Sequence, residues 1–382
     1  MSAQAPRSDM SVPRLYHLYV YPNEECNLAC KHCWITAKLA KTVKSRRVCS
    51  EDYIRLVDQA LPLGLGLIAI SGGEALMSKD EVLTLIEYAG SKGVSTRIET
   101  NGTLLDDRSA KVLAKARTQC SVSLDGATKA THERMRLVPG CFEETMRGLE
   151  ILRQYDVTTE IIMSVSTENF HELGAVTEIA ATMPRGHVKI NPILPSGRGR
   201  QLDRKGERMS MGELYAWIRT LEQERSKYAV PIIISAEPAF RSLHDIKQGL
   251  AKGDRCGFLN LLGILASGEI SFCGMGYKAK NYVFGNVFES SLADIWMNHP
   301  TLNEVRRSIP EALEGICSNC VMRTTCQGAC RASAYERFGS ITAPTPGCQQ
   351  LYDEGLFPRT RMVDPDRDSH YRPVQPTLSV LN

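Results

Sequence analysis

Three cysteines near the amino end of the chain are the residues best suited to do chemistry. Cys26, Cys30 and Cys33 stand within eight residues, with three and then two residues between them. Thiolates are soft ligands that suit iron–sulfur clusters, and one loop carrying three of them can hold a four-iron cube. Three ligands leave one iron open, so this loop can bind a small molecule as well as store electrons.

A structural zinc loop and a cluster of buried free thiols are the alternative interpretations of this segment. A closed zinc site requires a fourth ligand, and the nearest candidate is His32. This histidine lies between the second and third cysteines, where its reach toward a shared ion is poor. The eight residues therefore favour a cluster but leave zinc open.

Seven more cysteines form a second group in the carboxyl half of the chain. This group follows the spacing C-x11-G-x4-C, then C-x2-C-x5-C-x3-C, and ends in one isolated cysteine; its members are Cys256, Cys273, Cys317, Cys320, Cys326, Cys330 and Cys348. Seven thiols exceed one tetrahedral site. Two four-iron clusters have eight ligand positions, so one iron would lack a cysteine.

Composition narrows the class of protein. The chain has 382 residues, 43% of them hydrophobic, and a net charge of +3. This near balance argues against a dedicated nucleic-acid binder, and no apolar run reaches the ~18 residues that span a membrane. No signal peptide is evident, so we expect a cytoplasmic protein whose clustered thiols bind metal rather than form disulfides. Cys49, Cys120 and Cys141 stand alone and are expected to be small buried hydrophobic residues.

Strand and helix patterns alternate regularly after the first cysteine loop. Six such units predict an α/β fold with a parallel sheet, and six are too few for a closed eight-stranded barrel. We therefore expect an open (β/α)6 partial barrel. The expected strands are 15–21, 65–70, 94–98, 120–124, 158–165 and 187–191. Capping residues are expected at Ser50, at Ser78 with Glu81, and at Ser210 with Glu213, and a hairpin is expected over 259–273.

Polar and glycine-rich segments follow successive strands of this predicted sheet. They include Gly72-Gly73-Glu74, Glu99, Ser123, Ser164 and a basic stretch over 198–208. Ligands collect at the carboxyl ends of parallel strands, so we expect these segments to share one edge with the cysteine loop. Each segment alone is weak evidence for a site, but the recurrence of such segments after successive strands supports the prediction.

These motifs together resemble those of a radical S-adenosylmethionine (SAM) enzyme with a twitch-type SPASM domain. The resemblance rests on C-x3-C-x2-C followed by Trp34, on Gly72-Gly73-Glu74, and on the order and spacing of the seven later cysteines. It covers residues 15 to about 348. It implies three [4Fe–4S] clusters, SAM as cofactor, and a flavodoxin- or ferredoxin-type reductant.

The resemblance also implies roles for individual residues. Cys26, Cys30 and Cys33 would hold the SAM-cleaving cluster, while Gly72, Gly73 and Glu74 would receive the amino group of SAM. Ser123 would meet the ribose with help from Ser164. Among His132, His171 and Glu99, the last is the preferred general base. The ten expected cluster ligands are Cys26, Cys30, Cys33, Cys256, Cys273, Cys317, Cys320, Cys326, Cys330 and Cys348.

For the auxiliary clusters, the resemblance implies two ligand sets. Cys317, Cys320, Cys326 and Cys348 would close the outer cluster. Cys256, Cys273 and Cys330 would hold the inner one, nearer SAM. The fourth inner position is unassigned: a substrate group, a water or a side chain such as Asp254 would complete it, and a substrate thiolate there would suit thioether formation.

The expected domain organisation follows from these motifs. We expect a flexible N-terminus over 1–13, a radical SAM partial barrel over 14–235, a SPASM domain over 236–356 and an irregular tail over 357–382. Only 25 residues precede Cys26, whereas many related peptide maturases carry a leader-binding domain there. A leader peptide would then be held by a separate protein, by the barrel helices or by the auxiliary module, with the stretch 198–208 as a candidate contact.

Three classes of function compete. The preferred one is an enzyme that abstracts hydrogen from a residue of a ribosomally made precursor peptide and installs a thioether, carbon–carbon or similar crosslink. The alternatives are an anaerobic sulfatase-maturating enzyme, which makes formylglycine, or a small-molecule radical SAM dehydrogenase. The third class is a non-catalytic electron carrier or zinc scaffold, which has no use for an open-iron triad beside a ligand-binding barrel.

Overall fold

The computed structural model describes residues 12–39, 47–237, 240–241 and 256–364. Several sequence predictions lie outside these residues: most of the N-terminal segment 1–13, the end of the tail, and Asp254 as an inner-cluster ligand.

A single ten-stranded sheet organises the molecule. Its order is β12-β11-β10-β1-β4-β5-β6-β7-β8-β9, and the strands from β10 through β1 to β9 run parallel. The six predicted strands are all present, as β1 (His17–Val20), β4 (Leu67–Ile70), β5 (Ser95–Thr100), β6 (Gln119–Ser123), β7 (Thr159–Val165) and β8 (His187–Pro192). The partial-barrel prediction is confirmed.

The sheet extends past those six strands at both edges. β9 (Ile232–Ile234) pairs with β8, and β10 (Leu261–Ile264) pairs in parallel with β1. β10 continues into the predicted hairpin with β11 (Glu269–Ser271), which pairs with β12 (Val283–Asn286). The cysteine-rich half is therefore joined to the barrel by backbone hydrogen bonds, which a count of strand–helix units did not reveal.

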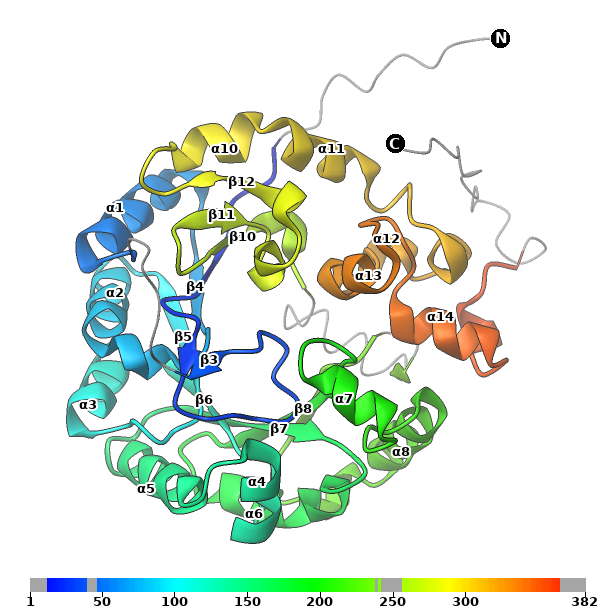
Figure 1. Ribbon diagram of the computed structural model, residues 1–382, viewed down its shortest axis with the longest axis horizontal. Coiled ribbons are helices and arrows are strands. Elements are labelled where there is room, and N and C mark those ends of the chain that lie inside the picture. The colour runs from blue at the N-terminus through cyan, green and yellow to red at the C-terminus, as the bar shows by residue number, and fades with distance from the viewer. Residues whose placement is uncertain (1–11, 40–46, 238–239, 242–255, 365–382) are drawn as a thin grey trace.

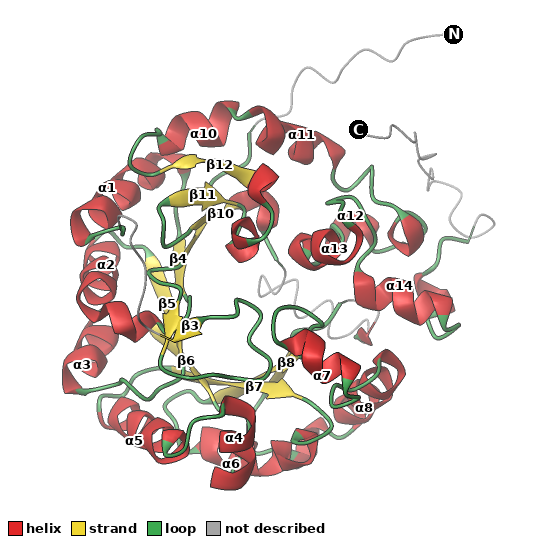
Figure 2. Cartoon of the chain, in the orientation of Figure 1, coloured by secondary structure: helices red, strands yellow, loops and turns green. Residues whose placement is uncertain are grey.

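Helices cover the outside of this sheet (Figure 1). Their bounds are α1 (Ser50–Ala60), α2 (Lys79–Ser91), α3 (Asp107–Lys115), α4 (Lys129–Arg136), α5 (Cys141–Gln154), α6 (Leu173–Ala181), α7 (Gly199–Arg204) and α8 (Met211–Gln223). The carboxyl-terminal half adds α10 (Leu292–Asn298), α11 (Pro300–Ser308), α12 (Arg323–Cys326), α13 (Arg331–Phe338) and α14 (Pro346–Asp353). Figure 2 shows the strands inside this helical layer, so the core lies between the sheet and the helices. Among the described helices, none has both the length and the apolar composition that a bilayer span requires.

The three predicted helix caps have different outcomes. Ser210 and Glu213 form the predicted capping box at the start of α8. At α1 the cap is Cys49, one residue earlier than predicted. Ser78 makes no capping bond, because its hydroxyl accepts a hydrogen bond from Asn23 at 3.0 Å and a short 3-10 helix precedes α2.

Alternation along the strands gives the barrel a polar interior. On β1, Leu18 and Val20 are buried in the core, whereas His17 and Tyr19 face the other way. β5 repeats this arrangement, with Arg97 and Glu99 half-buried between buried neighbours. The inside of the barrel can therefore hold a polar ligand.

Candidate active site

The first cysteine loop crosses the mouth of the barrel between β2 (Glu25–Cys26) and β3 (Lys38–Leu39) (Figure 1). Two segments distant in sequence fix its backbone. The Ala29 N–H donates to the Arg136 carbonyl at 3.2 Å, and the Arg198 N–H donates to the Cys33 carbonyl at 3.0 Å. The Arg198 guanidinium also donates to the Cys30 carbonyl at 2.8 Å. The loop is thus held from α4 on one side and from the segment after β8 on the other.

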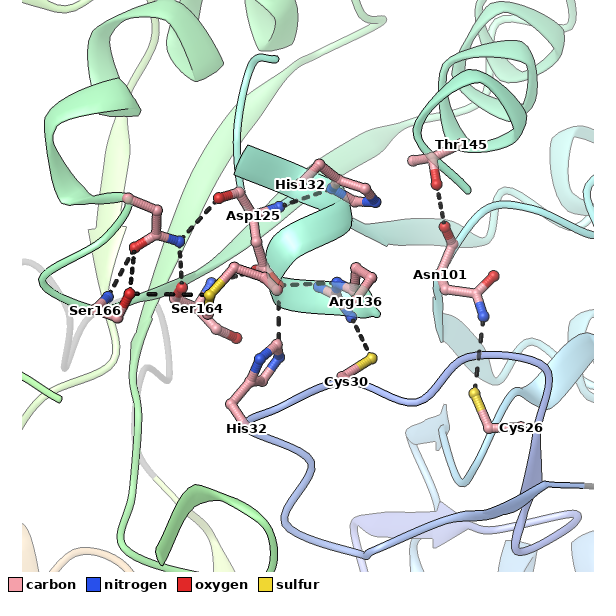
Figure 3. Close-up of polar contacts among 12 residues, drawn as sticks. Cys26, Cys30, His32, Asn101, Asp125, His132, Arg136, Thr145, Ser164 and Ser166 are labelled. Carbon is pink, nitrogen blue, oxygen red and sulfur yellow. Dashed lines mark hydrogen bonds and ion pairs between the residues drawn. The ribbon is translucent and has the colours of Figure 1, made fainter. Parts of the chain in front are cut away.

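Each sulfur of the loop accepts a hydrogen bond from an N–H group. The donors are the backbone of Leu28 to Cys26 at 3.3 Å and the backbone of Ala37 to Cys33 at 3.5 Å. Arg136 Nη1 donates to Cys30 Sγ at 3.5 Å (Figure 3). Such donors stabilise thiolate ligands and tune iron–sulfur clusters. The donor set therefore fits a four-iron cluster with one open iron.

His32 is turned away from the role of a zinc ligand. Its Nε2 lies 3.6 Å from the Asp125 carboxylate (Figure 3). Burial lowers the pKa of His32 to about 4, so the imidazole is neutral at neutral pH. With its Nε2 facing a carboxylate, His32 is not placed as the fourth ligand that a closed zinc site in this loop would need.

The Gly72-Gly73-Glu74 segment differs from its predicted geometry. The Glu74 carboxylate is buried and accepts three hydrogen bonds, from Leu76 N at 3.0 Å, Thr100 Oγ1 at 2.6 Å and Asn101 N at 2.7 Å. Burial raises the pKa of Glu74, and these three hydrogen bonds oppose that shift because they stabilise the charged carboxylate. This carboxylate braces the loops, and it is not turned toward a ligand.

The two glycines of this segment serve a close contact between backbones. A Cβ atom on Gly73 would lie 1.9 Å from the Glu25 carbonyl, and Gly72 has a φ of +132°. The Glu74 N–H also donates to the Glu25 carbonyl at 2.7 Å. The glycines therefore let the chain before Cys26 lie directly on this turn.

The preferred general base lies inside the barrel at the predicted edge. Glu99 accepts hydrogen bonds from the hydroxyl groups of Tyr19 and Ser71, both at 2.9 Å. Ser123 and Ser164 end β6 and lie late in β7, where they are half-buried. The Ser164 N–H donates to Asp125 Oδ1 at 2.9 Å. These residues share one edge of the sheet with the cysteine loop, as predicted.

Buried polar residues beneath the loop were not all predicted. His132 was a candidate base, but its contact with Asp125, and the roles of Asn101, Arg136 and Asn169, were not predicted; most of these residues are drawn in Figure 3. Asn101 Nδ2 lies 3.9 Å from Cys26 Sγ, and Asp125 forms an ion pair with Arg136. The one available signal was that Asn101 and Asp125 follow strands β5 and β6. Arg136 gave none, because it lies at the far end of a polar helix.

The cysteines of the outer auxiliary set, as the resemblance implied it, lie around one pocket. One pocket in the carboxyl-terminal half is lined by four of its cysteines and by apolar neighbours; the cysteines are Cys317, Cys320, Cys326 and Cys348. Burial and then the neighbouring thiols raise the pKa of Cys326 to about 12. Cys317 ends the turn Gly315–Cys317, Cys320 lies between that turn and α12, Cys326 ends α12, and Cys348 lies in α14. Four thiols around one pocket fit one four-iron cluster.

Cys256, Cys273 and Cys330 form a separate group. Burial and then the charge of Cys330 raise the pKa of Cys273 to about 12, and the exposed Cys256 lies close enough for the charges of Cys330 and Cys273 to act on it. The division of seven thiols into four and three therefore matches the implied outer and inner sets.

An aromatic contact joins the first cysteine loop (residues 26–33, called the SAM loop) to this inner group. The Gly274 N–H, next to Cys273, donates to the Tyr21 hydroxyl at 2.9 Å. The rings of Tyr21 and Trp34 lie 6.4 Å apart, and a Cβ on Gly274 would come within 2.3 Å of Trp34. Trp34 directly follows Cys33, so the two groups of cysteines meet across a few side chains.

The basic stretch 198–208 is largely occupied within the chain. Arg198 binds the cysteine loop, and Arg200 pairs with Glu336 at 2.8 Å. Glu336 also pairs with Lys278 at 2.9 Å and accepts from Ser196 at 2.6 Å, which ties the barrel to the carboxyl-terminal half. As a leader contact, this stretch therefore has less free charge than its sequence indicated.

Two family models match the chain where the two groups of cysteines lie. The radical SAM superfamily model matches residues 20–179, and the model of SPASM, an iron–sulfur cluster-binding domain, matches residues 256–321. The chain therefore carries a radical SAM domain and a SPASM domain. It is a radical SAM/SPASM enzyme, and its cofactors are SAM and [4Fe–4S] clusters.

Relatives of this chain carry names from more than one chemistry. An AdoMet-dependent heme synthase from Methanosarcina barkeri is 28% identical over 333 residues, which are 85% of this chain and 93% of that protein. A PqqA peptide cyclase from Granulibacter bethesdensis is 25% identical over 327 residues, 85% of this chain and 84% of that one. The solved structure of Streptococcus suis SuiB bound to precursor peptide SuiA has a TM-score of 0.67 at 16% identity, covering 88% of this chain and 76% of that one.

Proposed function

We propose that this enzyme abstracts a hydrogen atom from a residue of a ribosomally made precursor peptide and so installs a thioether, carbon–carbon or similar crosslink. SAM, bound at a reduced cluster, supplies a 5′-deoxyadenosyl radical for this chemistry. Cys26, Cys30 and Cys33 would hold that cluster. The remaining seven clustered cysteines would hold two auxiliary clusters in the sets of four and three described above.

The protein orients the reacting groups and excludes water. With the Glu74 carboxylate occupied by three donors, the backbone of Gly72 and Gly73 is left to meet the amino group of SAM. Ser123 and Ser164 lie at the same edge for the ribose. Glu99 would take the proton that the substrate loses, through a carboxylate already aligned by two hydroxyl groups.

The inner group of three cysteines is the observation that carries the peptide assignment. With Cys256, Cys273 and Cys330 as ligands, a four-iron cluster keeps one position for a further group. Through Gly274, the inner group contacts Tyr21 and Trp34, so these cysteines lie beside the SAM loop. A substrate thiolate or side chain could bind there. The names of the peptide cyclase and of the SuiB–SuiA complex support a peptide as substrate.

The test is anaerobic incubation of the reconstituted enzyme with SAM, a reductant and precursor peptides from neighbouring reading frames. We expect mass spectrometry to show a peptide lighter by two hydrogens per crosslink. Deuterium placed at the modified carbon should appear in 5′-deoxyadenosine. Formation of 5′-deoxyadenosine with no change in any such peptide would contradict the assignment, and formylglycine in a sulfatase would favour the maturase alternative.

A second candidate is oxidation of the carboxylate side chain of an iron porphyrin. The name of the Methanosarcina barkeri relative and two cations of the barrel interior favour it. Arg97 and Lys189 face inward from β5 and β8, and among the described residues Arg97 Nε is buried without a hydrogen-bond partner. Propionate groups would pair with them. This candidate would be established instead if the enzyme consumed the porphyrin and modified no peptide, and if Lys189→Met raised the KM for the porphyrin.

A further inference from the structure

Arg136 is a buried cation in direct contact with a cysteine of the SAM loop. It ends α4, and 6% of its surface is exposed. Its Nη1 donates to Cys30 Sγ at 3.5 Å, and its carbonyl accepts from the Ala29 N–H at 3.2 Å. One residue therefore contacts both the sulfur and the backbone of the loop, and Figure 3 shows its contact with the sulfur.

Asp125 fixes the direction of this guanidinium. Its Oδ2 lies 2.8 Å from Arg136 Nε, and Asp125 has no exposed surface. The other carboxylate oxygen accepts from the Ser164 N–H, and the Asp125 N–H donates to His132 Nδ1 at 3.2 Å. The carbonyl of Asp125 accepts from Asn169 at 2.8 Å. The carboxylate is held from several elements, so it has little freedom to move.

This pair is the charge in contact with the Cys30 sulfur, whereas the Arg198 guanidinium donates to the Cys30 carbonyl at 2.8 Å. Burial lowers the pKa of His132, which accepts from the Asp125 N–H, to about 4, so this histidine is neutral at neutral pH. The guanidinium stays charged under all ordinary conditions. A charged donor near a ligand sulfur withdraws electron density, which stabilises the more negative, reduced state of an iron–sulfur cluster.

We propose that Arg136, aligned by Asp125, is a positioning residue that raises the reduction potential of the SAM-cleaving cluster through its hydrogen bond to Cys30. This inference rests on the proposed role of the loop as the ligand of that cluster. It does not depend on which substrate the enzyme takes. The network would make the one-electron reduction that precedes SAM cleavage accessible to an ordinary cellular reductant.

The test is a redox titration of full-length, reconstituted protein followed by electron paramagnetic resonance. The signal of the SAM-cleaving cluster is assigned as the one that SAM perturbs. We expect Arg136→Met to shift the potential of that signal to more negative values, with the auxiliary signals unchanged. Asp125→Asn keeps the cation and removes the anion, so it should shift the same signal in the opposite direction. Arg134→Met, on the exposed side of α4, is the matched control and should shift nothing.

Several outcomes would overturn the inference. An unchanged potential in Arg136→Met with full iron content would do so. If Arg136→Met does not take up the iron of this cluster, Asp125→Asn becomes the test. An unchanged reduction potential in Asp125→Asn would then overturn the inference. Equal shifts in the same direction for both variants would indicate a merely structural role. A wild-type protein without any SAM-responsive signal would overturn the proposed function as well.

Discussion

The two cysteine-rich regions of this enzyme are built in opposite ways. The SAM loop takes its three thiols from eight consecutive residues, and the rest of the barrel supplies donors that point at them. The auxiliary region takes its seven thiols from segments spread over 93 residues, from Cys256 to Cys348. In the first region the ligands are already close in sequence, and the fold only supplies hydrogen-bond donors to them. In the second the fold itself brings the ligands together.

Because of this difference, loss of a thiol should affect mainly catalysis in the first region and mainly stability in the second. Removing a thiol from the SAM loop leaves its backbone held by Arg198 and by α4. Removing a thiol from the outer set disconnects elements that meet around one pocket. A metal site that cross-links distant segments contributes its binding free energy to folding. The two regions should therefore respond differently to the same kind of substitution.

The largest expected effect is on a pair of cysteine variants. Cys30→Ala should abolish formation of 5′-deoxyadenosine and remove about four of about twelve irons per chain, with little change in the thermal midpoint. Cys348→Ala should lose a similar amount of iron but unfold at a clearly lower temperature, because α14 loses its tie to residues 317–326. Iron analysis and circular dichroism measure both quantities.

Cys49→Ser is the control for this pair. Cys49 caps α1 and belongs to neither cysteine group, and a serine hydroxyl can cap a helix as well. Its iron content and thermal midpoint should stay at the wild-type values. Equal midpoints for Cys30→Ala and Cys348→Ala would contradict the contrast between the two regions.

Glu74→Gln tests how strongly the barrel braces the SAM loop. The buried carboxylate accepts three hydrogen bonds, and a neutral amide would present a donor to at least one of the same groups. We expect a loss of about 2 kcal/mol in the free energy of unfolding. Urea titration of the iron-free protein measures it. The exposed Glu87→Gln on α2 should lie within about 0.5 kcal/mol of wild type, and an equal loss there would refute a bracing role for Glu74.

Ser210→Ala concerns the helix on which the auxiliary region rests. The Ser210 hydroxyl caps α8, and Met211 of that helix lies near Gly347 of α14. We expect a cost of about 1 kcal/mol from the lost cap. Ser78→Ala should cost less, because Ser78 caps nothing and its partner Asn23 keeps a second hydrogen bond to the Glu74 carbonyl. The reverse order in urea titrations would invalidate this assignment of the caps.

The smallest expected effect is a pH dependence inside the barrel. Glu160 accepts from His187 at 3.1 Å and raises its pKa above 6.5, against burial and the nearby Lys189. Stabilisation by the charged histidine is therefore complete below pH 6.5 and is lost as the pH rises through the folded-state pKa. His187→Gln should lower the free energy of unfolding by less than about 1 kcal/mol at pH 6 and by a smaller amount at pH 9. A larger loss at pH 9 than at pH 6 would exclude this ion pair.

Local patterns in the sequence were sufficient to predict the barrel. Buried strands such as 67–70 are short apolar runs, and Ser210 with Glu213 depends only on residues three apart, so both were predicted correctly. The capping box at Ser78 failed because its hydroxyl is bound by Asn23, which lies 55 residues away in sequence. No local pattern records such a contact.

In the functional site, too, local sequence patterns were predictive and long-range contacts were not predicted. Cysteine spacing indicated both groups of thiols, because ligands of one cluster follow recognisable intervals. It did not show that the Glu74 carboxylate is turned inward, nor that Arg136 reaches Cys30 from a position 106 residues away. These are long-range contacts between buried polar groups, and they depend on how strands and helices are placed.

Anaerobic reduction of the reconstituted wild-type enzyme in the presence of SAM tests the central claim most directly. The account predicts about twelve irons per chain and release of 5′-deoxyadenosine. It predicts that Cys26→Ala, Cys30→Ala and Cys33→Ala each stop that release while about eight irons remain. Wild-type protein that holds about twelve irons but releases no 5′-deoxyadenosine would contradict it, as would continued release from any of the three variants.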